Sequence, residues 1–412
     1  MVEAPTAGEE TDMFTTDNRR RIRLAIVSPT PPRPCPVAAH TDELCRVLPS
    51  VAPRIGLTVY AIDHGDGQPT AGGRRVDGSI AADDPSAYRR AGQRLRRLGV
   101  DVALLEVGPG TAGGPHGRYL LGLTDELTRQ GVPYIVAAHH VRRSPLPDDA
   151  DALSALCRPA AGVVVASNSA GAALVSSRIV PPRRIAVVPP GPPLDLLDPR
   201  TTGPLPAALA RYGDGPLLTT TGYLSPARGI EVAVAALPGL AATHPGIRYV
   251  VAGRTLASRP PRVGDPYRRT VEAAADALGV AHRVIVLDGD LSAADTAALL
   301  RATDVYVAPD LDYARTDDRP LADAVGAGLR VVAAAAPYVA ELLGDRPDSI
   351  VRPGDPAALA AAVERVLKEP APQPGHRSFA HAAEQIAGLV ALVASPRPAP
   401  VRRAAAGRRT AA

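Results

Sequence analysis

Short apolar runs alternate with segments of helical spacing along most of this chain, and this alternation limits the fold more than any other feature. The first runs cover residues 22–28, 57–62, 102–105, 134–138 and 162–166, with helical segments between them. Runs of this length are typical of buried strands, and parallel strands need helical crossovers. The pattern therefore predicts an α/β protein with doubly wound parallel sheets.

A proline- and glycine-rich stretch over residues 189–216 interrupts the alternation, which then restarts. A chain of 412 residues is also too long for one ordinary hydrophobic core. We therefore expect two Rossmann-like domains, an N-terminal one over residues 21–190 and a C-terminal one over residues 216–370. Residues 191–215 are expected to form the linker between them.

Both ends of the chain differ from its body in composition. Residues 1–20 contain acids and no apolar core, so they do not resemble a signal peptide, and residues 396–412 carry five arginines and no acid. We expect both segments to be disordered tails. The alanine-rich apolar segment at residues 376–395 is expected to form a helix that returns to the N-terminal domain.

Charge and composition exclude several classes of protein. The arginines of the basic tail account for the net charge of +4, and aromatic residues are only 3%, which together argue against nucleic-acid binding. No run approaches 18 apolar residues, so no transmembrane helix is expected, although the tail leaves peripheral membrane contact open. Three cysteines without paired spacing favour a reducing, cytoplasmic location.

One strand-to-helix loop has the features of an anion site. Residues 217–229 read LLTTTGYLSPARG, so an apolar strand breaks at Gly222 and a helix begins near Gly229. Free backbone N–H groups and the helix dipole favour phosphate at such a helix start. Arg228 would add a planar cationic group suited to phosphate oxygens. An ordinary strand-to-helix turn has the same local pattern, so the loop alone leaves both interpretations open.

The sequence GYLSPARGIE at residues 222–231 resembles the Gly-x-x-Ser-Pro-x-Lys-Gly-Ile-Glu motif of the retaining GT-B glycosyltransferases of family four. Residues 166–191, 302–309 and 321–328 resemble further segments of that family in the same order. The resemblance covers residues 21–370. It implies two Rossmann-like domains facing each other across a crevice, a nucleotide-diphosphate sugar as donor, a carbohydrate or other hydroxyl acceptor, transfer with retention, and no cofactor.

The resemblance also implies roles for individual residues. Arg228 takes the position of a phosphate-binding lysine, in the loop that contains Gly222 and Gly229. His139 matches a histidine that holds the donor sugar from the opposite domain. Arg254, at the end of a predicted strand, is expected to reach the same crevice.

The family's two glutamates, seven residues apart from each other, fall on Arg315 and Asp323. Asp323 is therefore expected to bind the ribose hydroxyls, while Asp317 and Asp318 are expected to replace part of the missing first carboxylate. Tyr223 stands where the family has an arginine. If Arg315 pairs with Asp323 instead, a salt bridge would fill the ribose pocket.

These observations leave two hypotheses open. The first is a bacterial, cytoplasmic glycosyltransferase of carbohydrate biosynthesis, and the second is a catalytically degenerate GT-B paralogue that acts as a binding or partner subunit. A GT-B epimerase or phosphorylase is a weaker third, because the only lysine, Lys368, is poorly placed for pyridoxal phosphate. Asp-Gly-Asp at residues 288–290 is interpreted as a polar loop that enters a helix capped by Ser292, and His139 with His140 has no second group of ligands, so no metal site is expected. The sequence does not define the nucleobase, the sugar, the acceptor or the oligomeric state.

Overall fold

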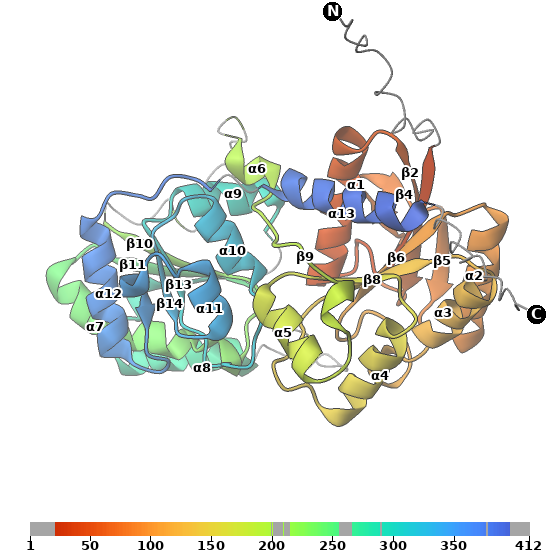
Figure 1. Cartoon of the computed structure of the whole chain (residues 1–412). Coiled ribbons are helices and arrows are strands. Elements are labelled where there is room, and N and C mark those ends of the chain that lie inside the picture. The colour runs from red at the N-terminus through yellow and green to blue at the C-terminus, as the bar shows by residue number, and fades with distance from the viewer. Residues whose placement is uncertain are drawn as a thin grey trace, which may run out of the picture.

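The computed structural model consists of two α/β domains that lie side by side (Figure 1). It describes residues 21–198, 200, 209, 215–254, 266–288, 291–375 and 378–395. The predicted tails at residues 1–20 and 396–412 lie outside the described residues, as does most of the predicted linker. Within the described residues, no helix is both long and apolar enough to cross a membrane.

The N-terminal domain contains a parallel seven-stranded sheet with the strand order β5-β2-β1-β6-β7-β8-β9. Its strands are β1 (Ile22–Ser28), β2 (Ile55–Asp63), β5 (Gly78–Ala81), β6 (Val102–Val107), β7 (Tyr134–Ala138), β8 (Gly162–Val165) and β9 (Ile185–Val187). A small hairpin joins β3 (Thr70–Ala71) and β4 (Arg74–Arg75). The helices are α1 (Pro36–Val51), α2 (Pro85–Arg97), α3 (Leu120–Arg129), α4 (Pro147–Cys157) and α5 (Asn168–Ser176).

The C-terminal domain repeats the design with a parallel six-stranded sheet in the order β12-β11-β10-β13-β14-β15. Its strands are β10 (Leu217–Thr221), β11 (Arg248–Gly253), β12 (Val284–Asp288), β13 (Val305–Ala308), β14 (Val331–Ala334) and β15 (Ile350–Val351). Its helices are α7 (Ile230–Thr243), α8 (Pro266–Ala277), α9 (Ala293–Arg301), α10 (Arg319–Gly326), α11 (Pro337–Leu342) and α12 (Pro356–Lys368). Short helix α6 (Leu194–Leu197) lies within the predicted linker.

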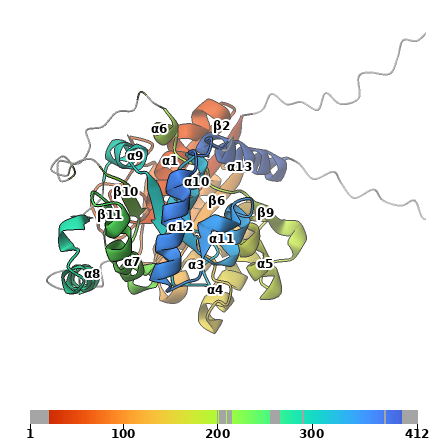
Figure 2. The ribbon, with the colours of Figure 1, turned by 90° about the vertical axis from the view of Figure 1, so that its left-hand side faces the viewer.

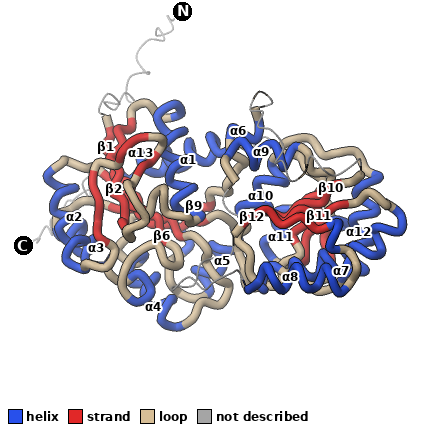
Figure 3. The backbone as a smooth tube through the Cα atoms, turned by 180° about the vertical axis from the view of Figure 1, so that it is seen from behind, coloured by secondary structure: helices blue, strands red, loops and turns tan. Residues whose placement is uncertain are grey.

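Each sheet is covered by helices on both faces, as Figure 3 shows by colour. In β1, Leu24 and Ile26 face the layer that contains α1, while Ala25 and Val27 face the layer that contains α2 and α3. In the C-terminal domain, α7, α8 and α12 cover one face, and α9, α10 and α11 cover the other (Figure 2). This two-sided burial is the reason that the strands read as continuous apolar runs in the sequence.

The last helix, α13 (Phe379–Ala394), follows the C-terminal domain in sequence but packs on the N-terminal domain (Figure 1). Phe379, Ala383 and Ile386 are buried in the same cluster as Leu24 and Leu44. Burial of one apolar stripe on α1 and β1 explains why this helix is alanine-rich and amphipathic.

In both domains the strand order reverses at one point, between β1 and β6 and between β10 and β13. The predicted fold class is therefore confirmed: two doubly wound, Rossmann-like parallel sheets. In such sheets, ligands bind beyond the carboxyl ends of the strands at the point of reversal.

Candidate functional site

A pocket of about 230 Å³ opens at the carboxyl ends of β10 and β11, beside the reversal point of the C-terminal sheet. Helices α9 and α10 close its other side. The residues that define it are Gly222, Tyr223, Gly253, Arg254, Thr296 and Asp323. Four of these, Gly222, Tyr223, Arg254 and Asp323, were singled out from the sequence, and the structure brings them together here.

Two glycines form the floor of this pocket. Gly222 has φ 110° and Gly253 has φ 156°. A Cβ atom on Gly253 would lie 1.8 Å from the carbonyl oxygen of Gly222, so the two loops approach backbone to backbone. Only glycine therefore fits at position 253, and the Pro320 ring lies beside Gly222, 3.1 Å from where a Cβ atom would stand.

Asp323 enters the pocket from α10 with Arg319 as its partner. The Arg319 Nε atom donates to both carboxylate oxygens, at 2.8 Å and 3.0 Å. Burial raises the pKa of Asp323 to about 6, although Arg319 opposes this shift. The alternative in which Arg315 pairs with Asp323 is not what the structure shows, because the i,i+4 spacing on α10 pairs Asp323 with Arg319 instead.

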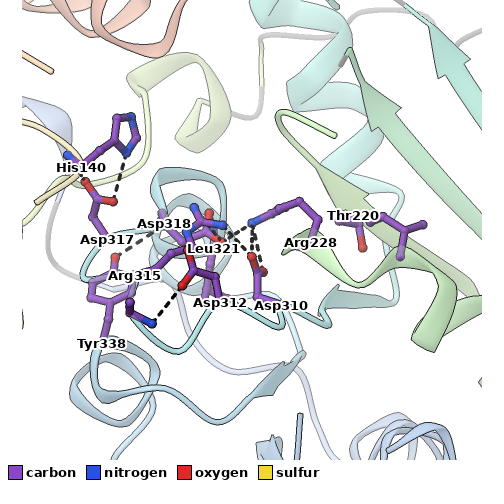
Figure 4. A network of polar contacts seen from close by, with 12 residues as sticks. His140, Thr220, Arg228, Asp310, Asp312, Arg315, Asp317, Asp318, Leu321 and Tyr338 are labelled. Atoms are coloured by element: carbon purple, nitrogen blue, oxygen red, sulfur yellow. Dashed lines mark hydrogen bonds and ion pairs between the residues drawn. The ribbon is translucent and has the colours of Figure 1, made fainter. Parts of the chain in front are cut away.

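Arg228 does not line the pocket and is only 4% exposed (Figure 4). Its Nη1 atom donates to Asp310 at 3.0 Å and 3.1 Å and to Asp318 at 2.6 Å, and its Nη2 atom donates to the Thr221 carbonyl at 3.0 Å. Although burial opposes its charge, Asp318 and Asp310 raise the pKa of Arg228 well above the ordinary value. We predicted that this guanidinium faces a phosphate site, but in the structure it is buried against the protein's own acceptors.

Arg315 completes a charge-balanced cluster with the same two carboxylates (Figure 4). It donates to Asp310 at 2.6 Å, and its other nitrogen lies 3.7 Å from Asp318. Burial alone would raise the pKa of Asp318, but Arg228 and Arg315 hold it below the ordinary value. Asp318 also accepts from the Leu321 amide at the start of α10. It therefore acts within the cluster and does not replace a missing ribose ligand.

The start of α7 is also occupied by internal contacts. Gly229 has φ 60°, and a Cβ atom there would lie 2.3 Å from the carbonyl oxygen of Pro309. Its amide donates to Pro226, and the next amide, of Ile230, donates to the Tyr267 hydroxyl at 3.1 Å. Gly229 is thus required for close packing, and the predicted anion site at this helix start is closed by the protein itself.

On the N-terminal domain, His139 follows β7 and pairs with a carboxylate that sequence analysis missed. The His139 Nε2 atom lies 2.5 Å from Oε2 of Glu106, which is the penultimate residue of β6 and is 1% exposed. The sequence signal that could have revealed Glu106 is the presence of an acidic residue within the apolar run VALLEV. His139 also lines a second cavity of about 290 Å³, together with Val107, Gly108, His116, His140, Leu153 and Leu174.

The loop before α10 joins the two domains. The His140 amide donates to Asp317 Oδ2 at 2.9 Å, and the His140 Nδ1 atom lies 3.1 Å from Asp317 Oδ1. Arg142 pairs with Asp312 at 3.0 Å, and the Ser167 hydroxyl donates to the Thr316 carbonyl at 2.6 Å. Burial opposes ionisation of Asp317, but His140 lowers its pKa to about 2. Asp317 therefore holds the domains together instead of facing the pocket (Figure 4).

Comparison with known proteins adds to this geometry. Residues 215–369 match the family model described as "Glycosyl transferases group 1". No curated protein sequence matches the chain significantly.

Solved structures of similar fold span nearly the whole chain. Anabaena Alr3699/HepE in complex with UDP-glucose is 16% identical with a TM-score of 0.64, and the match covers 90% of this chain and 97% of that one. Sucrose-phosphate synthase (tll1590) from Thermosynechococcus elongatus is 17% identical with a TM-score of 0.59, covering 91% and 96%. A glycosyltransferase from Rickettsia africae ESF-5 is 14% identical with a TM-score of 0.64, covering 91% and 93%. These likenesses establish the fold of the chain as GT-B.

Proposed function

We propose that this chain is a glycosyltransferase that transfers a sugar from a nucleotide-diphosphate donor to a hydroxyl acceptor, with retention at the anomeric carbon. The pocket beside Asp323 carries the proposal. It lies at the carboxyl edge of a Rossmann-like sheet, within the domain that matches the glycosyl transferases group 1 model. Binding of UDP-glucose by the Anabaena protein of similar fold supports this class of donor.

The pocket offers complementary groups for each part of a nucleotide. The Asp323 carboxylate would accept hydrogen bonds from the ribose hydroxyls, since an ionised carboxylate is an acceptor on both oxygens. Thr296 on α9 would line the wall beside the base. The diphosphate would lie beside the loops that contain Gly222 and Gly253, at the carboxyl ends of β10 and β11.

One arginine would supply positive charge for the diphosphate in place of Arg228. Arg254 lines the pocket together with Tyr223. A preorganised cation at this position would stabilise the charge that develops on the leaving group.

In the proposed reaction the acceptor oxygen bonds to the anomeric carbon while the bond from that carbon to the phosphate oxygen breaks. The nucleoside diphosphate leaves, and its phosphate oxygen takes the acceptor proton. No metal or other cofactor takes part in this step. His139 would contact the donor sugar from the N-terminal domain, with its ring fixed by Glu106.

Turnover of a panel of UDP-, GDP- and ADP-sugars tests the proposal, with release of nucleoside diphosphate as the readout. We expect release from at least one donor, and a loss of release in Asp323→Asn. Asp345→Asn is the matched control, because it removes the same charge from an exposed site outside the pocket. A folded wild-type chain that neither binds nor turns over any donor would contradict the proposal and support the role of a binding or partner subunit.

A further inference from the structure

Three residues far apart in sequence converge at the carboxyl edge of the N-terminal sheet. His40 lies on α1, Glu106 is the penultimate residue of β6, and His139 follows the neighbouring strand β7. One ligand atom of each residue lies within 4.8 Å of the other two. The reversal of strand order between β1 and β6 creates this convergence, because α1 follows β1 directly.

The Glu106 carboxylate is only half satisfied by its surroundings. Its Oε2 atom pairs with His139 at 2.5 Å, but Oε1 lies 4.0 Å from His40 Nε2, which is beyond hydrogen-bond distance. Oε1 is buried and has no hydrogen-bond partner among the described residues. A buried carboxylate oxygen without a partner is costly, so this atom indicates a missing group of positive charge.

Ring contacts hold both imidazoles in place around this carboxylate. The rings of His40 and His139 meet edge to face, with centroids 5.0 Å apart, and His40 meets the Phe379 ring in the same way at 5.3 Å. Both Nε2 atoms therefore face Glu106. Two imidazole nitrogens and one carboxylate form a donor set that suits Zn²⁺ and leaves a coordination position open.

We propose that His40, Glu106 and His139 bind a divalent transition-metal ion of the Zn²⁺ class. The ion would satisfy Oε1 of Glu106 and both imidazoles at once. This site shares His139 and Glu106 with the proposed glycosyl transfer, but its test measures metal binding and not transfer. It also revises the sequence-based expectation of no metal site, which considered His139 only with its neighbour His140.

Titration of Zn²⁺ into the full chain, after removal of bound metal with a chelator, tests the proposal by calorimetry. We expect one ion per chain with micromolar or tighter affinity. His40→Ala should weaken binding by more than about 100-fold, because even indirect partners of metal ligands change affinity by about 10–100-fold. His116→Ala is the matched control, since this histidine pairs with Asp149 elsewhere in the domain. Circular dichroism verifies that each variant is folded.

Two further measurements keep the test decisive if one variant does not fold. Co²⁺ should give the visible absorption bands of a four-coordinate site in the wild type and in His116→Ala, but not in His40→Ala or Glu106→Gln. Excess Zn²⁺ should raise the Tm of the wild type and leave that of His40→Ala unchanged. Absence of Zn²⁺ binding, or equal binding by His40→Ala, would overturn the proposal and leave Glu106 and His139 as a hydrogen-bonded pair.

Discussion

Both sheets bury carboxylates near the point where their strand order reverses, but the groups that face these negative charges differ between the two domains. In the C-terminal domain, Asp310 and Asp318 are matched by Arg228 and Arg315, so two negative charges meet two positive ones. In the N-terminal domain, Glu106 faces only imidazoles, and one carboxylate oxygen has no partner among the described residues. The first arrangement balances its charges, although the buried Nε atom of Arg228 has no hydrogen-bond partner among the described residues, whereas the second leaves a carboxylate oxygen for a cation to contact.

This comparison distinguishes charged side chains that are paired within the protein from those that are placed to contact a ligand. The Arg228 cluster stands where the sequence predicted phosphate binding, yet its cations are already neutralised by the protein (Figure 4). The nucleotide pocket of our proposal lies next to it, between the loops that follow β10 and β11. In our proposal, the cluster therefore supports the wall of the site without contacting the donor.

The largest expected effect is on stability. Arg228→Ala should lower the free energy of unfolding by about 3–5 kcal/mol, because it leaves buried carboxylates with one guanidinium fewer. Urea denaturation followed by circular dichroism measures this. Arg90→Ala breaks an exposed pair with Asp84 and should leave the stability close to that of the wild type. A stable Arg228→Ala chain with weakened nucleotide binding would instead return Arg228 to the role of a phosphate ligand.

The next effect concerns the affinity for nucleotide. Asp323→Asn should weaken binding of a nucleoside diphosphate by about 1.5–3 kcal/mol, the usual scale for hydrogen bonds to a charged group. Because burial raises the pKa of Asp323 to about 6, wild-type affinity should fall as the pH drops from 7.5 to 5. The variant should lose this titration. A pH profile that is the same in both proteins would place the ribose elsewhere.

A smaller effect is expected at the contact between the domains. Burial opposes the charge of His140, but Asp317 raises its pKa above the ordinary 6.5, while His140 lowers the pKa of Asp317 from 3.8 to about 2. The histidine contribution is lost as pH rises through its raised pKa, and the aspartate contribution is lost as pH falls through about 2. Stabilisation by the pair is therefore fullest between pH 3.8 and 6.5.

His140→Gln tests this window. Because the His140 side chain is 40% exposed, we expect a loss of only about 0.5–1 kcal/mol near pH 6 and a smaller one at pH 9. Thermal unfolding of both proteins at the two pH values measures the difference. An equal loss at both would show that the ion pair contributes nothing and that only the backbone contact matters.

The fold was accessible from the sequence because parallel strands buried on both faces are continuous apolar runs. The short edge strand β5 and the helix α6 were missed, since they contain only four residues each and carry little periodicity. A 3₁₀ turn at Pro115–Gly117 precedes α3, which begins at Leu120.

The site was predictable only where its residues lie close in sequence. Gly222 could be assigned from the local strand-to-helix pattern, and Asp323 from the family resemblance. The partners of Arg228 lie 82 and 90 positions away, so no local pattern could show that its charge is neutralised. The pairing of Arg319 with Asp323 follows from helical i,i+4 spacing and was available from the sequence.

The central claim is that the pocket between the β10 and β11 loops binds the nucleotide, and calorimetric titration of nucleoside diphosphates tests it most directly. Thr296→Trp should fill this pocket, whereas Leu153→Trp should fill the second cavity. We expect wild type and Leu153→Trp to bind one nucleoside diphosphate with similar affinity, and Thr296→Trp to bind none. Unchanged binding by Thr296→Trp, or loss of binding in Leu153→Trp alone, would contradict the claim.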